Sequence, residues 1–321
     1  MDNCIRGIKT GFTGMKKNRK AFVRDNLFGW SLVILSVIHF FIFWIYVNFD
    51  TILMTFQRFN VYTGELEWYG LNNYIQIFKE MVLGENASMQ RAFFNSFQAI
   101  AINLIILPIA IFSAYAFYKK MPCTTFFSVI FYIPQLISIV VLTMSFRYMF
   151  SADFGPIALL VAKIKGVESV DLISVESNFL WPVIWLFCIW SGLGANVIMM
   201  RGAMNKIPKE VSESAILEGC GFFQELIYIT LPMSLSTIGI YFIQTMGAAS
   251  GFLMPPMLIA QSGGDNGRFM TTAWYIFGNA NSSSAGAIIT VTTVGVLFTL
   301  LNTPLIVGTR ILVKKITPDL S

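Results

Sequence analysis

The stretch Ile207-Pro-Lys-Glu-Val-Ser-Glu-Ser-Ala-Ile-Leu-Glu-Gly-Cys-Gly-Phe-Phe-Gln-Glu-Leu-Ile-Tyr-Ile-Thr-Leu-Pro232 separates two hydrophobic regions of the chain. It is polar, and its apolar residues recur at helical spacing. Pro208 suits the first turn of a helix, and the glutamates that follow it favour the N-terminal half through the helix dipole. Gly219 and Gly221 then stop or bend the helix. The stretch therefore predicts a short helix, a glycine turn and a second short helix that enters a hydrophobic span.

The regions around this stretch have the composition of a polytopic membrane protein. Of the 321 residues, 55% are hydrophobic and only 12% are charged, whereas soluble domains carry about 25% charged residues. Six apolar runs are long enough to span a membrane, since a spanning helix needs roughly 20 residues. Because the runs are continuous rather than alternating, they predict helices and not barrel strands. The predicted spans lie near 27–49, 94–118, 126–150, 179–200, 233–254 and 285–308.

The distribution of charge predicts the orientation in the membrane. Fifteen of the 22 Lys and Arg residues fall in the two termini and in the loops 119–125 and 201–232. Cytoplasmic segments carry the excess of basic residues, so both termini and the 207–232 stretch are expected in the cytoplasm. The first run is too long and too aromatic for a cleavable signal peptide, and none is expected. The net charge of +5 is thus a topology signal, and a nucleic-acid partner is not expected.

Two interpretations of the 207–232 stretch compete. One is an amphipathic connector that lies on the inner leaflet, and the other is a surface that docks on a partner protein. Helices that lie on membranes usually carry basic polar faces, and here the charged face is acidic. An acidic edge beside small residues suits insertion into a partner's groove. The glutamates of that edge are Glu210, Glu213, Glu218 and Glu225.

Three segments of the stretch carry a resemblance to a known family. They are Glu213-Ser-Ala215, Glu218-Gly219-Cys220 and Ile229-Thr-Leu-Pro232. They resemble the EAA loop of ABC-type import permeases, which docks on an ATPase subunit. Ser214, Glu218 and Cys220 depart from the usual Ala, Asp and Ala, and all three replacements are small or preserve charge. The resemblance implies that coupling to the ATPase rests on Glu213, Ser214, Ala215, Glu218, Gly219 and Pro232.

Further elements resemble the carbohydrate-uptake branch of these permeases, and in particular the larger membrane subunit of maltose-type transporters. They are Gly70-Leu-Asn-Asn-Tyr74, Trp190-Ser-Gly192, the pair Gly263-Gly264, and Thr271 with Tyr275. Pro134-Gln-Leu-Ile-Ser138 resembles the opening of the third core helix in the permease family. After the fifth span the family often has Phe-Asp, and here Met254-Pro255 stands instead. This departure leaves the outer gate and the substrate class open.

The resemblance implies an all-α fold of about six transmembrane helices, the MetI-like fold of type I ABC importers. It predicts a basic N-terminal segment, a first span with an extracytoplasmic segment, a permease core that contains the 207–232 loop, and a short cytoplasmic tail. These parts cover residues 1–26, 27–93, 94–312 and 313–321. Gly192 and Gly194 thin one face of the fourth span and are expected to permit close helix packing.

A sugar pathway needs polar groups and stacking aromatic rings in an apolar wall. The resemblance places the pathway along the fourth to sixth spans, and hydrogen bonds between helices are the alternative use of such residues. Candidate pathway residues are Asn196, Gln244, Ser250, Tyr241 and Trp190. No Asp, Glu or Lys occupies the centre of a predicted span, which disfavours transport coupled to ions. His39 and four scattered cysteines offer little for a metal site or a disulfide.

The expected partners are a second homologous permease subunit, two nucleotide-binding ATPase subunits, an extracytoplasmic solute-binding protein and the lipid bilayer. The chain contains no GxxxxGK[ST] motif, so ATP and Mg²⁺ are expected on the ATPase partner, and this chain is expected to bind no cofactor and to be no enzyme. Alternatives are an ABC permease for a peptide, polyamine or phosphate ester, a stand-alone secondary carrier or membrane-embedded enzyme, and a non-transporting assembly or sensor subunit.

Overall fold

The computed structural model describes residues 19–167, 170–174, 176–281 and 284–317. Two compact units divide the chain after Met54. The predicted N-terminal segment and tail lie partly outside the described residues. Helices dominate both units, as the composition predicted.

The first unit is one helical rod made of three segments. These are α2 (Arg19–Phe40), the π-helical η1 (Phe41–Tyr46) and α3 (Val47–Met54). Gly29–Met54 is long and apolar enough to cross a membrane, with a mean hydropathy of 2.2. Large apolar side chains are exposed on every side of it, including Trp30 at 64% and Trp44 at 59%. A helix that is apolar all round belongs in lipid or against other helices.

The second unit opens with a small hairpin and three short helical segments. In the hairpin, β1 (Gln57–Phe59) pairs antiparallel with β2 (Leu66–Trp68), so that Gln57 faces Trp68. It leads into α4 (Asn72–Phe78), η2 (Lys79–Leu83) and α5 (Ala87–Ser96). The amide of Asn73 donates to the carbonyls of Thr55 and Gln57, each at 2.8 Å. Asn73 of the Gly70–Tyr74 element thus joins the segment that follows the hairpin to the residues where the hairpin begins.

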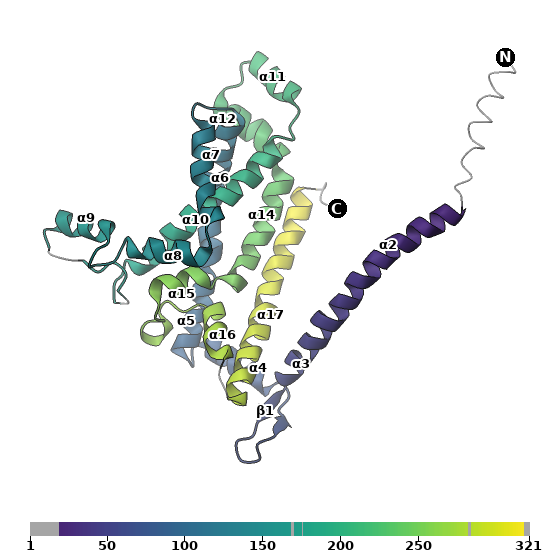
Figure 1. Ribbon diagram of the computed structural model, residues 1–321, viewed down its shortest axis with the longest axis vertical. Coiled ribbons are helices and arrows are strands. Elements are labelled where there is room, and N and C mark those ends of the chain that lie inside the picture. Colours follow the sequence, from purple (N-terminus) through teal and green to yellow (C-terminus); the bar gives the residue numbers. More distant parts are fainter. Residues whose placement is uncertain (1–18, 168–169, 175, 282–283, 318–321) are drawn as a thin grey trace. The chain divides into compact units, whose positions relative to one another are not determined.

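Three further helices of the second unit are long and apolar enough to span a membrane. They are Ala87–Tyr118, which joins α5 to α6 (Gln98–Tyr118), together with α10 (Leu180–Met204) and α17 (Ala285–Ile316). Figure 1 shows α6, α10, α14 (Leu235–Gly247) and α17 running along the second unit, with α11 (Lys209–Leu217) at one end and α4 and α5 toward the other. The predicted spans 94–118, 179–200 and 285–308 correspond to these helices, although α17 continues to Ile316.

The predicted span 126–150 is bent near its middle, and the predicted span 233–254 is bent where it begins. The first is a pair, α7 (Thr124–Leu136) and α8 (Ile139–Tyr148), bent by 105°. The second is a pair, Phe222–Met233 and Leu235–Gly251, bent by 72°. Extended backbone at Ile137 and a non-helical ψ of 4° at Ser234 cause the two breaks. The described residues therefore hold four candidate spans, or six when each bent pair counts as one.

The remaining elements are short and, apart from α14 within the second bent pair, lie at the ends of the spans. They are α9 (Pro156–Lys165), α11 (Lys209–Leu217), α12 (Phe222–Glu225), η3 (Leu226–Thr230), α13 (Leu231–Met233), α14 (Leu235–Gly247), η4 (Ala248–Gly251), α15 (Met254–Ala260), η5 (Asp265–Gly267) and α16 (Thr272–Ala280).

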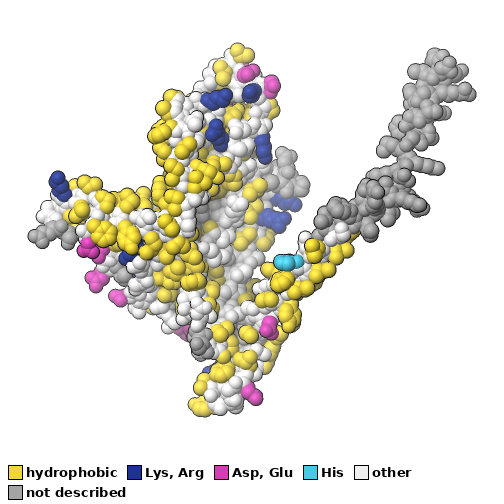
Figure 2. Space-filling view, in the orientation of Figure 1, with side chains coloured by type: hydrophobic (Ala, Val, Ile, Leu, Met, Phe, Trp, Pro, Cys, Tyr) yellow, Lys and Arg dark blue, Asp and Glu magenta, His cyan; other side chains and the backbone are white. Residues whose placement is uncertain are grey.

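The core of the second unit is built around α6 and α10. Ile106, Tyr115 and Phe187 are almost completely buried between these helices and their neighbours. Gly192 and Gly194 permit the contact that the sequence predicted, since a Cβ at Gly194 would lie 2.1 Å from the Phe131 carbonyl oxygen of α7. Figure 2 shows hydrophobic side chains over α7 and α8, whereas charged side chains gather at the end that carries α11.

Candidate functional site: the α11 surface and the span interior

The predicted helix of the 207–232 stretch is α11, and both of its ends follow from the local sequence. Pro208 precedes the helix as its N-cap, with ψ of 136°, so it stands one residue before the first turn in which it was predicted. At the other end Gly219 has φ of +80°, a left-handed conformation that glycine adopts without strain. The N–H of Cys220 reaches back to the Ala215 carbonyl at 2.9 Å, which closes the turn.

The exposed surface of α11 combines acids with an apolar tip. Glu213, Ser214, Glu218 and Gly219 are exposed. Leu217 is 88% exposed and Ile216 is 58% exposed, although both are large and apolar. Ala215 is only 5% exposed, so it packs against this chain and does not itself offer a contact to a partner. Pro232 is exposed in α13.

The second helix of the stretch runs from Phe222 to Met233 through α12, η3 and α13. Gly221 is its N-cap, and the Gln224 side chain accepts a hydrogen bond of 2.9 Å from the Gly221 N–H. This run is the first half of the second bent pair, as expected for a helix that leads into a span. The sequence predicted the helix but not the π-helical turn or the 72° bend that follows it.

Glu225 corrects one part of the sequence interpretation. It was grouped with the acids of an exposed edge, yet it is 3% exposed. Its carboxylate lies 2.5 Å from the Nζ of Lys119 and accepts a hydrogen bond of 2.7 Å from the Ser212 hydroxyl. Lys119 also donates to Ser212 at 3.0 Å. Sequence reasoning missed this cluster, because Lys119 stood out only as a basic loop residue.

Aromatic residues at the end of α6 hold the same region. The Tyr115 hydroxyl donates to the Phe222 carbonyl at 3.1 Å, and the two rings lie 4.7 Å apart. Phe112 stacks on Phe223 with ring centres 6.4 Å apart. The turn between α11 and α12 is therefore attached to α6 by polar and aromatic contacts.

The predicted pathway residues divide into two groups. Tyr241 is 3% exposed and donates to the Asn103 carbonyl at 2.7 Å. The Asn196 amide donates to Gly192 of its own helix at 2.8 Å. The Tyr241 bond joins α14 to α6, the alternative use that the sequence left open, whereas the Asn196 bond stays within α10.

The other three candidates remain accessible. Trp190 is 39% exposed on α10 and stacks on Phe146, with ring centres 5.9 Å apart. Gln244 is exposed on α14. Ser250 lies in η4, where its hydroxyl accepts a hydrogen bond of 3.0 Å from the Asn302 amide of α17. Asn302 thereby orients Ser250, a relation that the sequence did not indicate.

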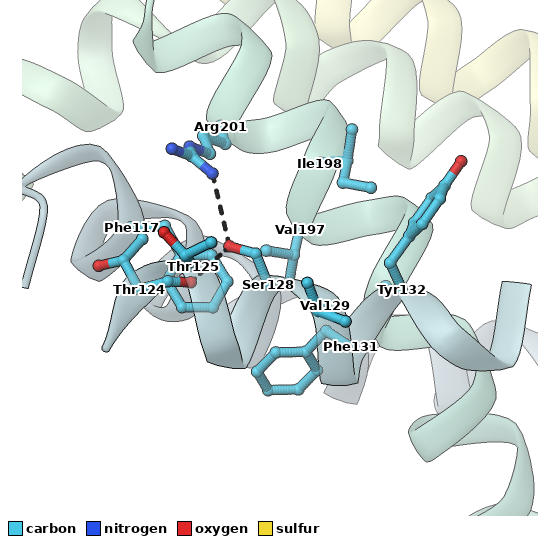
Figure 3. A pocket seen from close by; sticks show the side chains of 11 residues that line it. Phe117, Thr124, Thr125, Ser128, Val129, Phe131, Tyr132, Val197, Ile198 and Arg201 are labelled. Carbon is cyan, nitrogen blue, oxygen red and sulfur yellow. Dashed lines mark hydrogen bonds between the residues drawn. The ribbon is translucent and has the colours of Figure 1, made fainter. Parts of the chain in front are cut away.

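A cavity of about 470 Å³ opens between α7 and α10 near the end that carries α11. Figure 3 shows Arg201 pointing toward Ser128 at one side of it, where the two side chains lie 3.5 Å apart. The rest of its wall is mainly apolar and includes Val129, Phe131 and Val197. The sequence did not indicate this cavity.

A polar cavity of about 560 Å³ lies toward the opposite end of the unit. Arg91, Glu176, Asp265 and Arg268 line it. Arg268 donates to the Asn178 side chain at 2.6 Å, and Arg91 donates to the Asp265 carbonyl at 3.1 Å. Within the described ranges no three His, Cys, Asp or Glu side chains cluster as metal ligands would.

Comparison with known proteins gives a family match over most of the second unit. Residues 106–318 match the family described as "Binding-protein-dependent transport system inner membrane component". The arabino-oligosaccharide permease AraP of Halalkalibacterium halodurans is 28% identical over 68% of this chain. The polygalacturonan/rhamnogalacturonan permease YteP of Bacillus subtilis is 29% identical over 67% of this chain. Each match covers 66% of the relative, so the chain spans just under two thirds of their length.

The fold has a solved counterpart. The crystal structure of a bacterial ABC transporter "involved in the import of the acidic polysaccharide alginate" contains a chain that this one resembles with a TM-score of 0.77 at 20% identity. The alignment covers 94% of this chain and 100% of that one. At this identity the likeness shows the fold, which is that of ABC importer permeases.

Proposed function

Because the chain belongs to the binding-protein-dependent transport system inner membrane component family, we propose that it forms half of the translocation pathway of an ATP-driven importer for an oligosaccharide or related glycoside. It is a multi-pass membrane protein, and we place both termini and α11 in the cytoplasm. The observation that carries the proposal is α11, a helix bounded by Pro208 and Gly219 that exposes Glu213 beside Ile216 and Leu217.

The exposed surface of α11 suits a groove on an ATPase subunit. Leu217 would leave water on docking, and burial of such a side chain contributes roughly 1.5–3 kcal/mol. Glu213 and Glu218 would pair with basic residues at the rim of the groove. Two neighbouring apolar side chains rimmed by polar residues are typical of a protein interaction site.

The proposed substrate class rests on the descriptions of relatives and on three accessible side chains of this chain. The relatives named above carry arabino-oligosaccharides and polygalacturonan or rhamnogalacturonan by their descriptions. In this chain Trp190 supplies a face for stacking on a sugar ring, and Gln244 and Ser250 supply groups for hydroxyl pairing. Pro255 and Pro256 open α15 directly after η4, so the fifth span ends in irregular backbone. In transporters such backbone is found where it lines a pathway.

The assembly that we propose contains this chain, a second homologous permease subunit, two ATPase subunits and an extracytoplasmic solute-binding protein. One solved relative is the alginate transporter in complex with a pentasaccharide-bound periplasmic protein. ATP and Mg²⁺ would be bound by the ATPase subunits, and this chain would perform no hydrolysis. Closure of the ATPase dimer would push on α11 and switch the spans between inward-facing and outward-facing arrangements.

The experiment that tests this assembly is an affinity pull-down of the chain from its native membranes in mild detergent, followed by mass spectrometry. We expect a nucleotide-binding subunit and a second multi-span permease to co-elute. The solute-binding protein that accompanies them can then be screened against sugars, peptides, polyamines and phosphate esters, which separates the sugar proposal from the other solutes. Recovery of this chain alone at several detergent strengths would contradict the importer.

Two substitutions test the docking surface itself. Glu213→Lys reverses a charge at the proposed contact, and Gly219→Pro removes the glycine that closes α11. We expect both variants to insert in the membrane and to lose uptake and the ATPase subunit together. Normal uptake in both would show that α11 is not the coupling helix.

A further inference from the structure

Three polar side chains, one on α11 and two beside it, form a cluster that takes no part in the proposed contact with the ATPase. Lys119 Nζ lies 2.5 Å from a Glu225 carboxylate oxygen and donates to the Ser212 hydroxyl at 3.0 Å. That hydroxyl donates in turn to the other Glu225 oxygen at 2.7 Å. The three groups close a ring of charge-assisted hydrogen bonds. Each belongs to a different element, since Lys119 caps α6, Ser212 lies on α11 and Glu225 ends α12.

The burial of this cluster indicates what it contributes. The Glu225 side chain is 4% exposed and the Lys119 side chain is 20% exposed, and theirs is the sole ion pair among the described residues. Removing an ion pair from water costs about as much as the attraction returns, so such a pair adds little net stability compared with apolar residues. The pair does constrain geometry, because the Lys119 and Glu225 side chains must stay within bonding distance of each other. The pair therefore fixes how α6 and α12 are placed.

Ser212 joins α11 to the ion pair as well. Its hydroxyl is the atom through which α11 joins the ion pair, as it accepts from Lys119 and donates to Glu225. On the other side of the pair, Tyr115 of α6 holds the Phe222 carbonyl at 3.1 Å. The three elements are thus joined by polar bonds with fixed geometry, and not only by apolar packing that can slide.

We propose that Lys119, Ser212 and Glu225 are positioning residues that make α11, α12 and the adjoining end of α6 move as one body. This inference rests on the proposed function, because it takes α11 to be the helix on which the ATPase pushes. A displacement of α11 would then reach α6 directly through Ser212. From α6 it would pass to α10, which lies close against it where a Cβ at Gly192 would meet the Ile106 side chain at 2.9 Å.

The variants that test this inference separate placement from stability. Replacing Lys119 alone would leave Glu225 as an unpaired buried charge and destabilise the fold. The double replacement Lys119→Met with Glu225→Met removes both charges and leaves neither unpaired, so it is expected to fold. Ser212→Ala keeps the ion pair and removes its bond to α11. Thr309→Val is the matched control, since the Thr309 hydroxyl bonds only to Leu305 of its own helix.

The readout is the distance between two spin labels in the assembled transporter. One label replaces exposed Lys209, the first residue of α11, and the other replaces exposed Met121 just after α6. Native cysteines are changed to serine. The distance distribution is measured without nucleotide and with Mg·ATP plus vanadate. With the native cluster, and with Thr309→Val, we expect the same narrow distribution in both states.

In the Ser212→Ala and double-Met variants we expect the distance to broaden and to differ between the two states, while the thermal unfolding midpoint stays near that of the unsubstituted protein. A loss of stability alone would not produce a nucleotide-dependent distance. The inference fails if the native distance already changes with nucleotide, or if both variants behave like the control. If no ATPase subunit co-purifies, the proposed function itself fails and the inference falls with it.

Discussion

At the scale of single residues, Gly194 sets the distance between α10 and α7. A Cβ there would lie 2.1 Å from the Phe131 carbonyl oxygen, a backbone atom that cannot rotate away. Gly192 is less constrained, because a Cβ at that position would meet only the end of the Ile106 side chain, at 2.9 Å. A flexible side chain can yield, whereas a helix backbone has to shift as a whole.

We therefore expect Gly194→Ala to destabilise the fold by about 1–3 kcal/mol, the usual cost of forced overpacking. Gly192→Ala should cost less. Gly202→Ala is the control on the same helix, since its Cβ would meet nothing within 4 Å, and it should be neutral or slightly stabilising. Thermal unfolding in detergent micelles measures all three. Equal midpoints for Gly194→Ala and Gly202→Ala would refute the close contact.

Gly219 is constrained by its backbone and not by its neighbours. It has φ of +80° and open space around its Cβ position. Gly219→Ala should cost about 1–2 kcal/mol through the left-handed conformation and should loosen the end of α11. Gly166→Ala is a matched control, because Gly166 has φ of +68° and equally open surroundings after α9.

Gly219→Ala and Gly166→Ala carry a similar backbone cost, so they differ only in which helix end the strain affects. We expect Gly219→Ala to reduce the amount of ATPase subunit that co-purifies and Gly166→Ala to leave it unchanged. Co-purification after matched expression measures the difference. An equal reduction in both would mean that strain anywhere in the chain weakens assembly.

At the scale of elements, the sequence predicted which segments are helical and apolar, but not how they bend. A hydropathy average treats 126–150 as one run, whereas the path of α7 and α8 depends on the backbone angles of Ile137 and Ser138. Pro134 gave a local sign of a kink, yet the break follows it by three residues. Pro232 likewise stands two residues before the 72° bend at Ser234, but neither proline indicates the angle of its bend.

The candidate site shows the same limit for side chains. The helical pattern and Gly219 sufficed to predict α11 and its end, because those features depend on neighbouring residues. The burial of Glu225 depends on Lys119, which lies on another helix and has no sequence relation to it. Likewise the sequence could not predict the hydrogen bond from Tyr241 to the Asn103 carbonyl, because Asn103 lies on another helix.

The Asn95 amide is one of the groups that hold the segment preceding α16. Asn95 of α5 donates to the carbonyls of Arg268 and Met270 at 3.0 and 2.8 Å. Asn95→Ala would leave both carbonyls without this donor, and each lost bond costs about 0.5–1.5 kcal/mol. We expect faster hydrogen exchange in residues 266–272. The control is Asn279→Ala, whose amide bonds only within its own helix, and equal protection in both variants would contradict the role of Asn95.

At the scale of the whole molecule, the charge pattern predicts which end faces the cytoplasm. Tyr62, in the β1–β2 hairpin, is completely exposed, and Cys123, next to α7, is also exposed. Two single-cysteine variants test the orientation with a membrane-impermeant maleimide. One keeps only Cys123, and the other carries Tyr62→Cys with all native cysteines replaced. We expect Tyr62→Cys to react in intact cells and Cys123 to react only after permeabilisation. The reverse pattern would invert the topology.

The ion pair between Lys119 and Glu225 also bears on how the chain is made. Glu225 is synthesised 106 residues after Lys119, which at 5–20 residues per second takes about 5–20 s. During that interval Lys119 is an uncompensated positive charge beside a newly inserted helix, and such charges hold a loop on the cytoplasmic side during insertion. One lysine would thus act first as a signal that orients the nascent chain and later, once neutralised, as a structural contact.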